Sequence, residues 1–148
     1  MKKYLFIIIL FVSGCGYQSI YSTNKSQNFE FYKITTEGES DINRKIINSI
    51  SLKEDNTNPV LNELLLVSSF KIDATSKDKK GQIKSYKSKI VVNLTIKNDK
   101  NIIRYKSFSE EFAYNNKDNK FELLQYQKEV RDILINKIVE EIILFLNL

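Results

Sequence analysis

Apolar and polar residues alternate along three long segments in the middle of the chain. In residues 83–97 the apolar side chains fall mainly at even positions, from Tyr86 to Ile96, and polar ones such as Lys87 and Asn93 fall at odd positions. A period of two residues predicts a strand with one covered and one exposed face. Residues 102–114 alternate similarly, with Phe108, Phe112 and Tyr114 in phase. Residues 60–75 carry apolar side chains at both parities, which predicts a strand partly covered on both faces, although this pattern also fits a short buried helix.

Three further segments complete the predicted elements. Residues 29–36 alternate aromatic and polar side chains, which predicts a first strand. A helix is expected from Ser40 or Asp41, either of which can cap it, to about Lys53, with one apolar face made of Ile42, Ile46, Ile47 and Ile50. The turn-rich stretch "KEDNTNP" follows this helix.

The last segment gives the clearest helical pattern. Apolar residues recur every three or four positions from Phe121 to about Leu146. Asn119 with Glu122 three residues later resembles a capping box, which marks a helix start. The order of elements is therefore β-α-β-β-β-α. Because helix stripes and a sheet face both need covering, we expect an α+β fold in which two helices pack on one face of a four-stranded sheet, whose other face carries Lys, Asn and Ser.

The first residues carry a different pattern. Met1-Lys2-Lys3 is cationic, and residues 4–12 are an unbroken apolar run, about half the ~20 residues that a membrane-spanning helix needs. Small residues follow, and "VSGC" ends at Cys15. This outline is that of a secretory signal, and it looks like a bacterial lipobox in which Cys15 is acylated and becomes the first mature residue. The alternatives are an ordinary cleaved signal followed by a free cysteine, or a retained anchor, for which the run is short.

The predicted organisation is thus a lipoprotein signal peptide at residues 1–14, a lipidated tether at 15–28 and one domain at 29–148. Gly16 follows the cysteine. An Asp at that position would favour retention in the inner membrane, so the Gly favours the outer membrane. Loss of Lys2 and Lys3 lowers the formal net charge from +5 to +3, and we expect no nucleic-acid partner.

Composition narrows the possible chemistry. The 148 residues contain no His and a single Cys, so His-dependent bases, Cys–His dyads and four-ligand zinc sites are excluded. Glu110 and Glu111 are the most obvious acidic pair, but adjacent residues of a strand point to opposite faces. The chain has no phosphate-binding glycine loop. We therefore expect neither an enzyme nor a bound metal or cofactor.

Four stretches carry a resemblance to the LPS-assembly lipoproteins, the LptE family of Gram-negative bacteria. They are "CGYQSIYS", "DINRKIINSI", "KKGQIKSYKSKIVVNLTI" and "NKDNKFELLQYQKEVRDILINKIVEEII", which together cover essentially the whole mature chain. The resemblance implies an outer-membrane lipoprotein with palmitate at Cys15. Its domain would plug the lumen of the LptD-type lipopolysaccharide translocon barrel as a heterodimer, help that barrel to assemble, and bind lipopolysaccharide.

The resemblance also implies binding residues. The family's basic residue at the hairpin tip matches Lys79, next to Lys80 and before Gly81, and a second basic residue matches Lys117 in the loop before the last helix. Lysine ammonium groups can reach anionic lipid A phosphates as point charges. The alternative is that these lysines only keep exposed turns soluble, and the same holds for the sheet lysines Lys84, Lys87 and Lys89. A different candidate function is an accessory or lipid-carrier lipoprotein of another envelope transport system.

Overall fold

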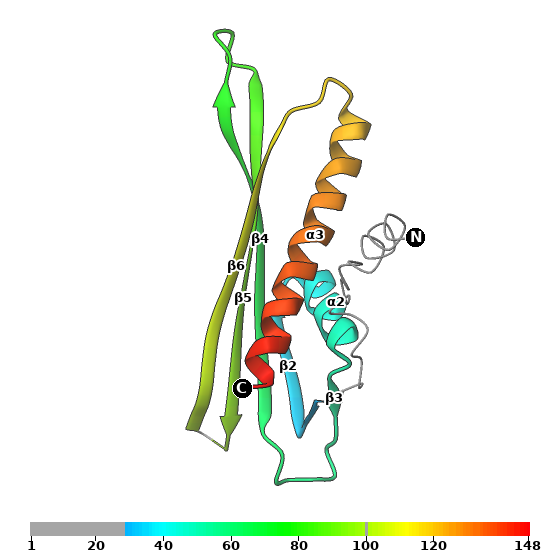
Figure 1. Cartoon of the computed structure of the whole chain (residues 1–148), viewed down its shortest axis with the longest axis vertical. Coiled ribbons are helices and arrows are strands. Elements are labelled where there is room, and N and C mark those ends of the chain that lie inside the picture. The colour runs from blue at the N-terminus through cyan, green and yellow to red at the C-terminus, as the bar shows by residue number, and fades with distance from the viewer. Residues whose placement is uncertain (1–28, 100) are drawn as a thin grey trace, which may run out of the picture.

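The domain is built around a four-stranded sheet (Figure 1). A computed structural model describes residues 29–99 and 101–148; Cys15 and the predicted signal and tether lie outside them. The sheet has the order β2-β4-β5-β6, formed by β2 (Lys33–Gly38), β4 (Glu63–Lys77), β5 (Ile83–Asn98) and β6 (Asn101–Asn115). β2 runs parallel to β4, and the other neighbours are antiparallel. The predicted α+β fold is confirmed.

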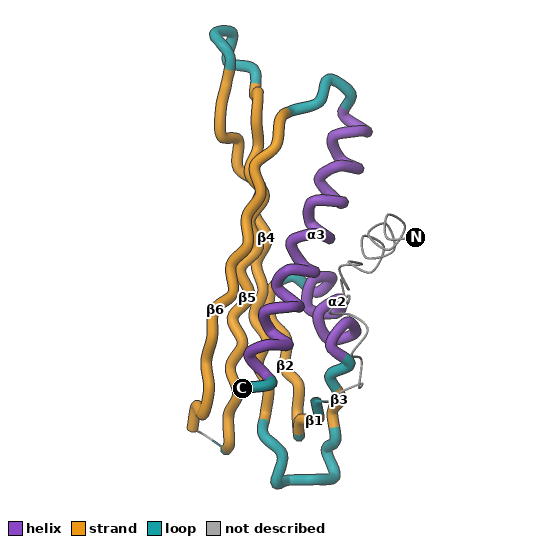
Figure 2. The backbone as a smooth tube through the Cα atoms, in the orientation of Figure 1, coloured by secondary structure: helices purple, strands orange, loops and turns teal. Residues whose placement is uncertain are grey.

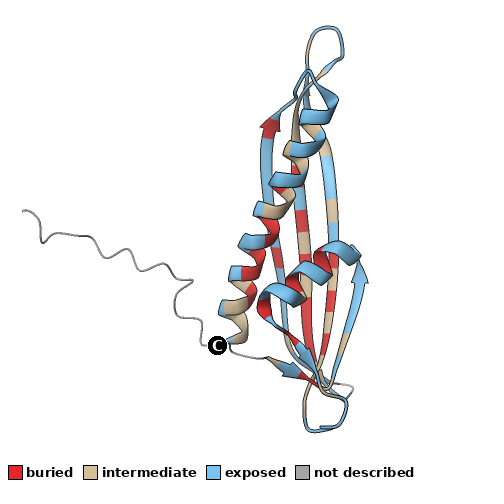
Figure 3. Cartoon of the chain, turned by 90° about the vertical axis from the view of Figure 1, so that its right-hand side faces the viewer, coloured by how far each residue is buried: buried red, intermediate tan, exposed pale blue. Residues whose placement is uncertain are grey.

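Both helices, α2 (Ser40–Ile50) and α3 (Lys120–Leu146), lie on the same face of this sheet (Figures 1 and 3). α2 differs from the prediction at both ends. Its N-cap is Glu39, which makes no side-chain capping bond, so neither Ser40 nor Asp41 is the cap. It ends at Ile50 because Ser51 adopts a left-handed conformation, with φ of 57°, and so turns the chain out of the helix.

α3 begins one residue earlier than predicted, and its cap is the predicted one. The side chain of Asn119 accepts hydrogen bonds from the backbone N–H groups of Phe121 (2.8 Å) and Glu122 (3.4 Å). These bonds satisfy two of the donors that a helix start leaves unpaired. With 27 residues, α3 is about 40 Å long and runs along most of the sheet.

The predicted first strand is broken at Tyr32. Its first part is β1 (Glu30–Phe31), which pairs in parallel with β3 (Lys53–Glu54), a strand that the turn-rich sequence did not suggest (Figure 2). The Tyr32 N–H donates instead to the carbonyl of Asn62 (2.9 Å), in the loop before β4. β1 and β3 therefore form a separate small sheet at the end of the domain where the described chain begins.

The core fills the space between the sheet and the helices (Figure 3). The even-numbered side chains of β5 face it, and Ile42, Ile46 and Ile50 of α2 are buried as predicted. Its largest fully buried side chains are Phe108, Ile42, Ile46, Leu64, Leu66, Ile90, Leu94, Leu134, Ile135, Ile138 and Ile142.

None of the helices in the described part of the chain is long and apolar enough to cross a membrane.

The uncovered sheet face is less polar than predicted. Lys89 and Asn93 lie on it as expected, but Leu65, Thr95 and Tyr105 also form a row across β4, β5 and β6 on that face. Thr95 is buried within this row although no helix covers it. The prediction of a face of Lys, Asn and Ser therefore holds only in part, because β4 carries apolar residues at both parities.

Candidate functional site

The candidate site lies at the end of the domain formed by the β4–β5 hairpin and the loop before α3 (Figure 1). β2 pairs only with residues 63–68 of β4, so the hairpin continues beyond it as a narrow arm. The register of this arm shifts between Ala74 and Ser76. There the Ser85 hydroxyl lies 2.7 Å from that of Thr75 and 2.6 Å from that of Ser76. An irregularity of this kind bends the arm and changes the direction in which its tip points.

Asp78 builds the tip of the hairpin. Its carboxylate accepts hydrogen bonds from the backbone N–H groups of Lys80 (2.8 Å) and Gln82 (2.9 Å). Gly81 has a φ of 80°, which suits glycine, and its N–H donates to the Asp78 carbonyl (3.0 Å). The backbone is thus held from inside the turn, and the side chains of Lys79 and Lys80 are both exposed.

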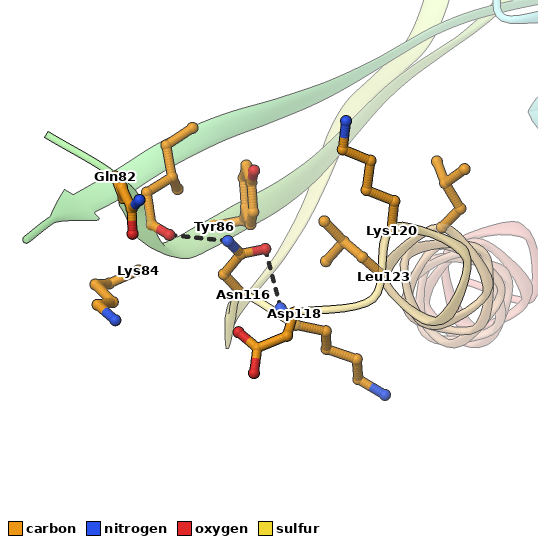
Figure 4. A pocket seen from close by; sticks show the side chains of 10 residues that line it. Gln82, Lys84, Tyr86, Asn116, Asp118, Lys120 and Leu123 are labelled. Atoms are coloured by element: carbon orange, nitrogen blue, oxygen red, sulfur yellow. Dashed lines mark hydrogen bonds between the residues drawn. The ribbon is translucent and has the colours of Figure 1, made fainter.

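Asn116 fastens the neighbouring loop to the base of the hairpin (Figure 4). Its side-chain amide donates to the Ile83 carbonyl (2.9 Å), and its backbone N–H donates to the Lys84 carbonyl (2.8 Å). Its side-chain oxygen accepts from the N–H of Lys117 (2.9 Å). A loop far along the chain is therefore positioned against the first residues of β5.

An open groove of about 520 Å³ lies between this loop, β5 and the start of α3. Lysines from three different segments line it: Lys84 from β5, Lys117 from the loop and Lys120 from α3. Figure 4 shows Lys84 and Lys120 on opposite sides of Asn116, so their ammonium groups do not meet at one point, and Asp118 lies at the groove as well. Leu123 and Leu124 of α3 add apolar surface. A groove with a cationic rim and an apolar wall fits an anionic amphiphile better than a purely polar or purely apolar ligand.

Three tyrosines pack together at this end, and one of them, Tyr86, lines the groove. The rings of Tyr86 and Tyr114 stack with centroids 5.9 Å apart, and Tyr126 of α3 meets Tyr114 edge-on at 5.5 Å. The Lys117 ammonium lies 4.7 Å from the centre of the Tyr126 ring. This cation–π contact directs Lys117 towards α3 without neutralising its charge.

The lysines of this end have no acidic partner among the described residues. No carboxylate of residues 29–99 or 101–148 lies within 4.0 Å of the ammonium groups of Lys79, Lys80, Lys84, Lys117 or Lys120. Lys87, in contrast, pairs with Glu111 across the sheet at 3.4 Å. Acidic side chains are nevertheless present: Asp118 also lines the groove, and Glu122 and Glu129 line a smaller pocket together with Lys117. The end therefore presents an excess of positive charge, with no ion pair between these five lysines and any described carboxylate.

The structure separates the predicted site residues into two groups. Lys117 lines the groove, whereas Lys79 and Lys80 lie beyond it at the hairpin tip, and Cys15 lies outside the described residues. Sequence reasoning grouped Lys84 with the sheet lysines Lys87 and Lys89, but its even number places it with Tyr86 on the side of the helices. The alternation of side chains along the strand would have been enough to distinguish Lys84 from Lys87 and Lys89. The roles of Lys120 and Asn116 have no such signal, because they arise from contacts between distant segments.

The described residues do not resemble a metal site. Among residues 29–99 and 101–148, no group of three or more His, Cys, Asp or Glu side chains could hold a metal ion.

Comparisons with known proteins support the fold. No family model matches the sequence, and no curated protein matches it. The structure is similar to that of rare lipoprotein B from Shewanella oneidensis, with a TM-score of 0.59, 9% identity, and coverage of 78% of this chain and 93% of that one. It is also similar to lipoprotein B from Nitrosomonas europaea, with a TM-score of 0.58, 10% identity, and coverage of 78% and 81%.

A third similar structure is a minor lipoprotein from Acinetobacter baumannii, with a TM-score of 0.53, 11% identity, and coverage of 77% of this chain and 89% of that one. At such low identities the likeness concerns the fold. The fold of residues 29–148 is thus one that bacterial lipoproteins use, and it extends over most of each of those chains.

Proposed function

We propose that this protein is a lipid-anchored lipoprotein of the Gram-negative envelope that binds lipopolysaccharide and plugs an LptD-type translocon barrel in the outer membrane. Acylated Cys15 supplies the anchor and residues 15–28 the tether. The domain sits in the barrel lumen or faces the periplasm, supports barrel assembly, and touches the lipid head group with its lysine-bearing end. The mechanism is binding, and no residue acts as a catalyst.

The observation that carries this proposal is the gathering of unpaired lysines at one end of a lipoprotein fold. Lipid A carries phosphates, and exposed ammonium groups attract them as point charges. Five lysines from four segments, which are the hairpin turn, β5, the loop before α3 and α3, share this end: Lys79, Lys80, Lys84, Lys117 and Lys120. The apolar wall made by Leu123 and Leu124 suits a ligand that carries acyl chains beside its phosphates.

The dimensions of the domain support a role inside a barrel. β5 has 16 residues, which correspond to about 53 Å of strand. A bilayer with its head groups is about 40–45 Å thick. Since the described chain begins at the end opposite the lysines, the domain is long enough to present them across a bilayer from its anchored side (Figure 1).

The packing favours a plug over an acyl-chain carrier. A carrier needs a sizeable apolar cavity, and the natural place for it is between the sheet and the helices. That space is filled by fully buried side chains such as Phe108, Leu134 and Ile138. The groove described above is instead open and lies at one end of the domain.

Affinity purification of the mature protein from outer membranes tests the proposal directly. We expect one large outer-membrane β-barrel to co-purify in equal amount, together with lipopolysaccharide. A variant with Lys84→Gln and Lys120→Gln should still retain the barrel and lose lipopolysaccharide. Recovery of a soluble envelope transporter instead of a barrel would support the alternative, an accessory lipoprotein of another system.

The anchor has a test of its own. Cys15→Ala should abolish palmitate incorporation and leave an unprocessed precursor, because the thiol that accepts the lipid is gone. Cys15 is the only cysteine, so labelling of the wild type cannot come from another thiol. Normal processing and palmitate labelling of Cys15→Ala would contradict the anchor.

A further inference from the structure

Large apolar side chains are exposed at the end of the domain opposite the lysines. Ile102 and Ile103 at the start of β6 are 63% and 51% exposed, and Leu144 and Leu148 at the end of the chain are 67% and 97% exposed. Tyr105 is exposed beside them on β6. We call these five residues the apolar end. Such a group on a water-facing surface is a mark of an interaction site.

Arg104 connects the β6 part of the apolar end to the part at the end of α3. Its guanidinium donates a hydrogen bond to the Phe145 carbonyl and lies 4.0 Å from the centre of the Phe145 ring. The start of β6 is therefore held against the last turn of α3. The positive charge also complements the C-terminal end of the α3 dipole.

The described chain begins at this same end of the domain (Figures 1 and 2). The carbonyl of Phe29 accepts a hydrogen bond from the N–H of Lys53 (2.9 Å), and Tyr32 is bonded to Asn62. The side chain of Asn62 in turn accepts from that of Asn98 (3.3 Å), at the turn that leads into β6. Hydrogen bonds through Asn62 thus connect Tyr32, near the start of the described chain, with Asn98 at the end of β5.

We propose that the apolar end rests on the lipid surface when the protein is anchored and not yet held by a barrel. This inference rests on the anchor in the proposed function, and not on the barrel or on lipopolysaccharide. Cys15 lies 14 positions before Phe29, so an anchored tether keeps this end within about 45 Å of the bilayer. Tethering at such a range gives an effective concentration of about millimolar, which makes a weak apolar contact significant.

The chemistry of the apolar end suits a lipid interface. Tyrosine is enriched where membranes meet water, because its ring is apolar and its hydroxyl is polar. Tyr105 contributes its ring, while its hydroxyl donates to the Asn93 side chain (3.3 Å) on the uncovered sheet face. Lys97 and Lys106 lie beside the apolar side chains on β5 and β6, and long cationic side chains at this depth reach lipid phosphates, whereas Arg104 is held by Phe145. Contact at this end holds the lysine-bearing end about 40 Å from the bilayer, which is the length of α3.

The chain offers a clean experiment because it has no Trp and one Cys. The protein comprising residues 15–148, which includes every described residue, is coupled through Cys15 to maleimide-bearing lipid in vesicles of phosphatidylcholine and phosphatidylglycerol. Ile103→Trp places a reporter at the apolar end. Phe121→Trp is the matched control, since Phe121 is an exposed apolar residue, 74% accessible, at the lysine-bearing end.

We expect brominated phosphatidylcholine to reduce the emission of Ile103→Trp by about two-fold, with a blue shift, because a shallow apolar contact brings the ring to the acyl boundary. Phe121→Trp should be unaffected. Adding Leu144→Glu and Leu148→Glu to Ile103→Trp should remove the quenching, while circular dichroism shows that the fold is kept.

Three results would overturn the inference. One is the absence of quenching at Ile103→Trp, and another is equal or stronger quenching at Phe121→Trp. The third is a blue shift of Ile103→Trp that grows with protein concentration in the absence of vesicles, which would make this surface a contact between two copies of the chain. Because the coupling is chemical, each of these results is separate from the palmitate labelling that tests the natural anchor.

Discussion

The side-chain amide of Asn116 lies 2.9 Å from the main-chain carbonyl of Ile83, 33 residues earlier in the chain. This hydrogen bond joins the loop before α3 to the first residue of β5, and a second bond from the Asn116 backbone to Lys84 strengthens the connection. The groove between the two segments exists because they are held together at this point. The affinity of the groove for a ligand should therefore depend on Asn116, which carries no charge itself.

Replacing Asn116 by Ala tests this dependence. The variant loses the bond to Ile83 and the one that its side-chain oxygen accepts from Lys117, and we expect a loss of about 1–2 kcal/mol in the free energy of unfolding. Lipopolysaccharide affinity should fall with it, measured by binding to the purified protein. Asn115→Ala, a change in the neighbouring exposed residue, is the control. Unchanged binding by Asn116→Ala would mean that the groove is not the ligand site.

The sequence predicted the elements well where the pattern repeats over many residues. α3 was placed to within one residue because apolar positions recur over seven turns and Asn119 marks its start. β5 and β6 were placed equally well, since their alternation extends over at least a dozen residues. Long repeats are reliable because many side chains independently support the same period.

Short and long-range features could not be predicted in the same way. A two-residue strand such as β3 has no period, and its pairing with β1 depends on where α2 ends. The predicted apolar face of α2 consisted of isoleucines alone, yet Asn43 is also buried and its amide donates to the Glu37 carbonyl (2.9 Å). The groove likewise depends on contacts between β5 and a loop about 30 residues away, which no local pattern encodes.

Gly38 and Gly81 form a natural pair for a test of backbone strain. Both have positive φ, 82° and 80°. A Cβ on Gly38 would lie 1.9 Å from the Ser68 carbonyl oxygen, whereas a Cβ on Gly81 would meet nothing within 4 Å. Gly81→Ala should therefore cost only the conformational strain, about 1 kcal/mol.

Gly38→Ala adds a backbone clash to the same strain, because the Ser68 oxygen also accepts the N–H of Glu39 and cannot move freely. We expect a loss of roughly 3 kcal/mol or more, or failure to accumulate folded protein. Urea unfolding followed by circular dichroism gives both values. Equal losses of unfolding free energy in Gly38→Ala and Gly81→Ala would show that the Ser68 carbonyl can move aside without further cost.

Arg104 should stabilise the end of α3. Arg104→Ala removes the hydrogen bond to the Phe145 carbonyl and the cation–π contact with its ring, and we expect a loss of about 1–2 kcal/mol. Hydrogen exchange should become faster in the last turn of α3. Arg44→Ala breaks an exposed ion pair with Asp41 and should cost no more than about 0.5 kcal/mol. If both variants lose the same small amount, Arg104 does not hold the helix end.

Glu54 makes the small sheet sensitive to acid. Its pKa is lowered from the ordinary value of 4.5, mainly by the hydrogen bond from the Ile34 N–H (2.8 Å) and further by that from the Asn56 side chain (3.0 Å). Because the pKa is lower in the folded state, the stabilisation is complete above pH 4.5 and is lost as the pH falls through the folded-state value. Glu54→Gln should therefore be less stable than the wild type at neutral pH, and this difference should shrink in acid. If the difference between the urea unfolding midpoints of the wild type and Glu54→Gln stays the same from neutral pH to below pH 4.5, the Glu54 carboxylate does not provide this stabilisation.

The two tip lysines give the sharpest test of lipopolysaccharide recognition. Lys79→Gln with Lys80→Gln removes two charges from a turn whose backbone is held by Asp78, so the hairpin should keep its shape. A phosphate contact of this kind contributes about 1 kcal/mol per lysine, and we expect binding to weaken by roughly 30-fold. Lys53→Gln with Lys89→Gln removes the same charge from two exposed lysines that form no ion pair with a described carboxylate and lie away from the tip, and it is the matched control. If both pairs weaken binding equally, the ligand responds only to net charge; if the tip pair has no effect, these lysines keep the turn soluble and recognition belongs to the groove.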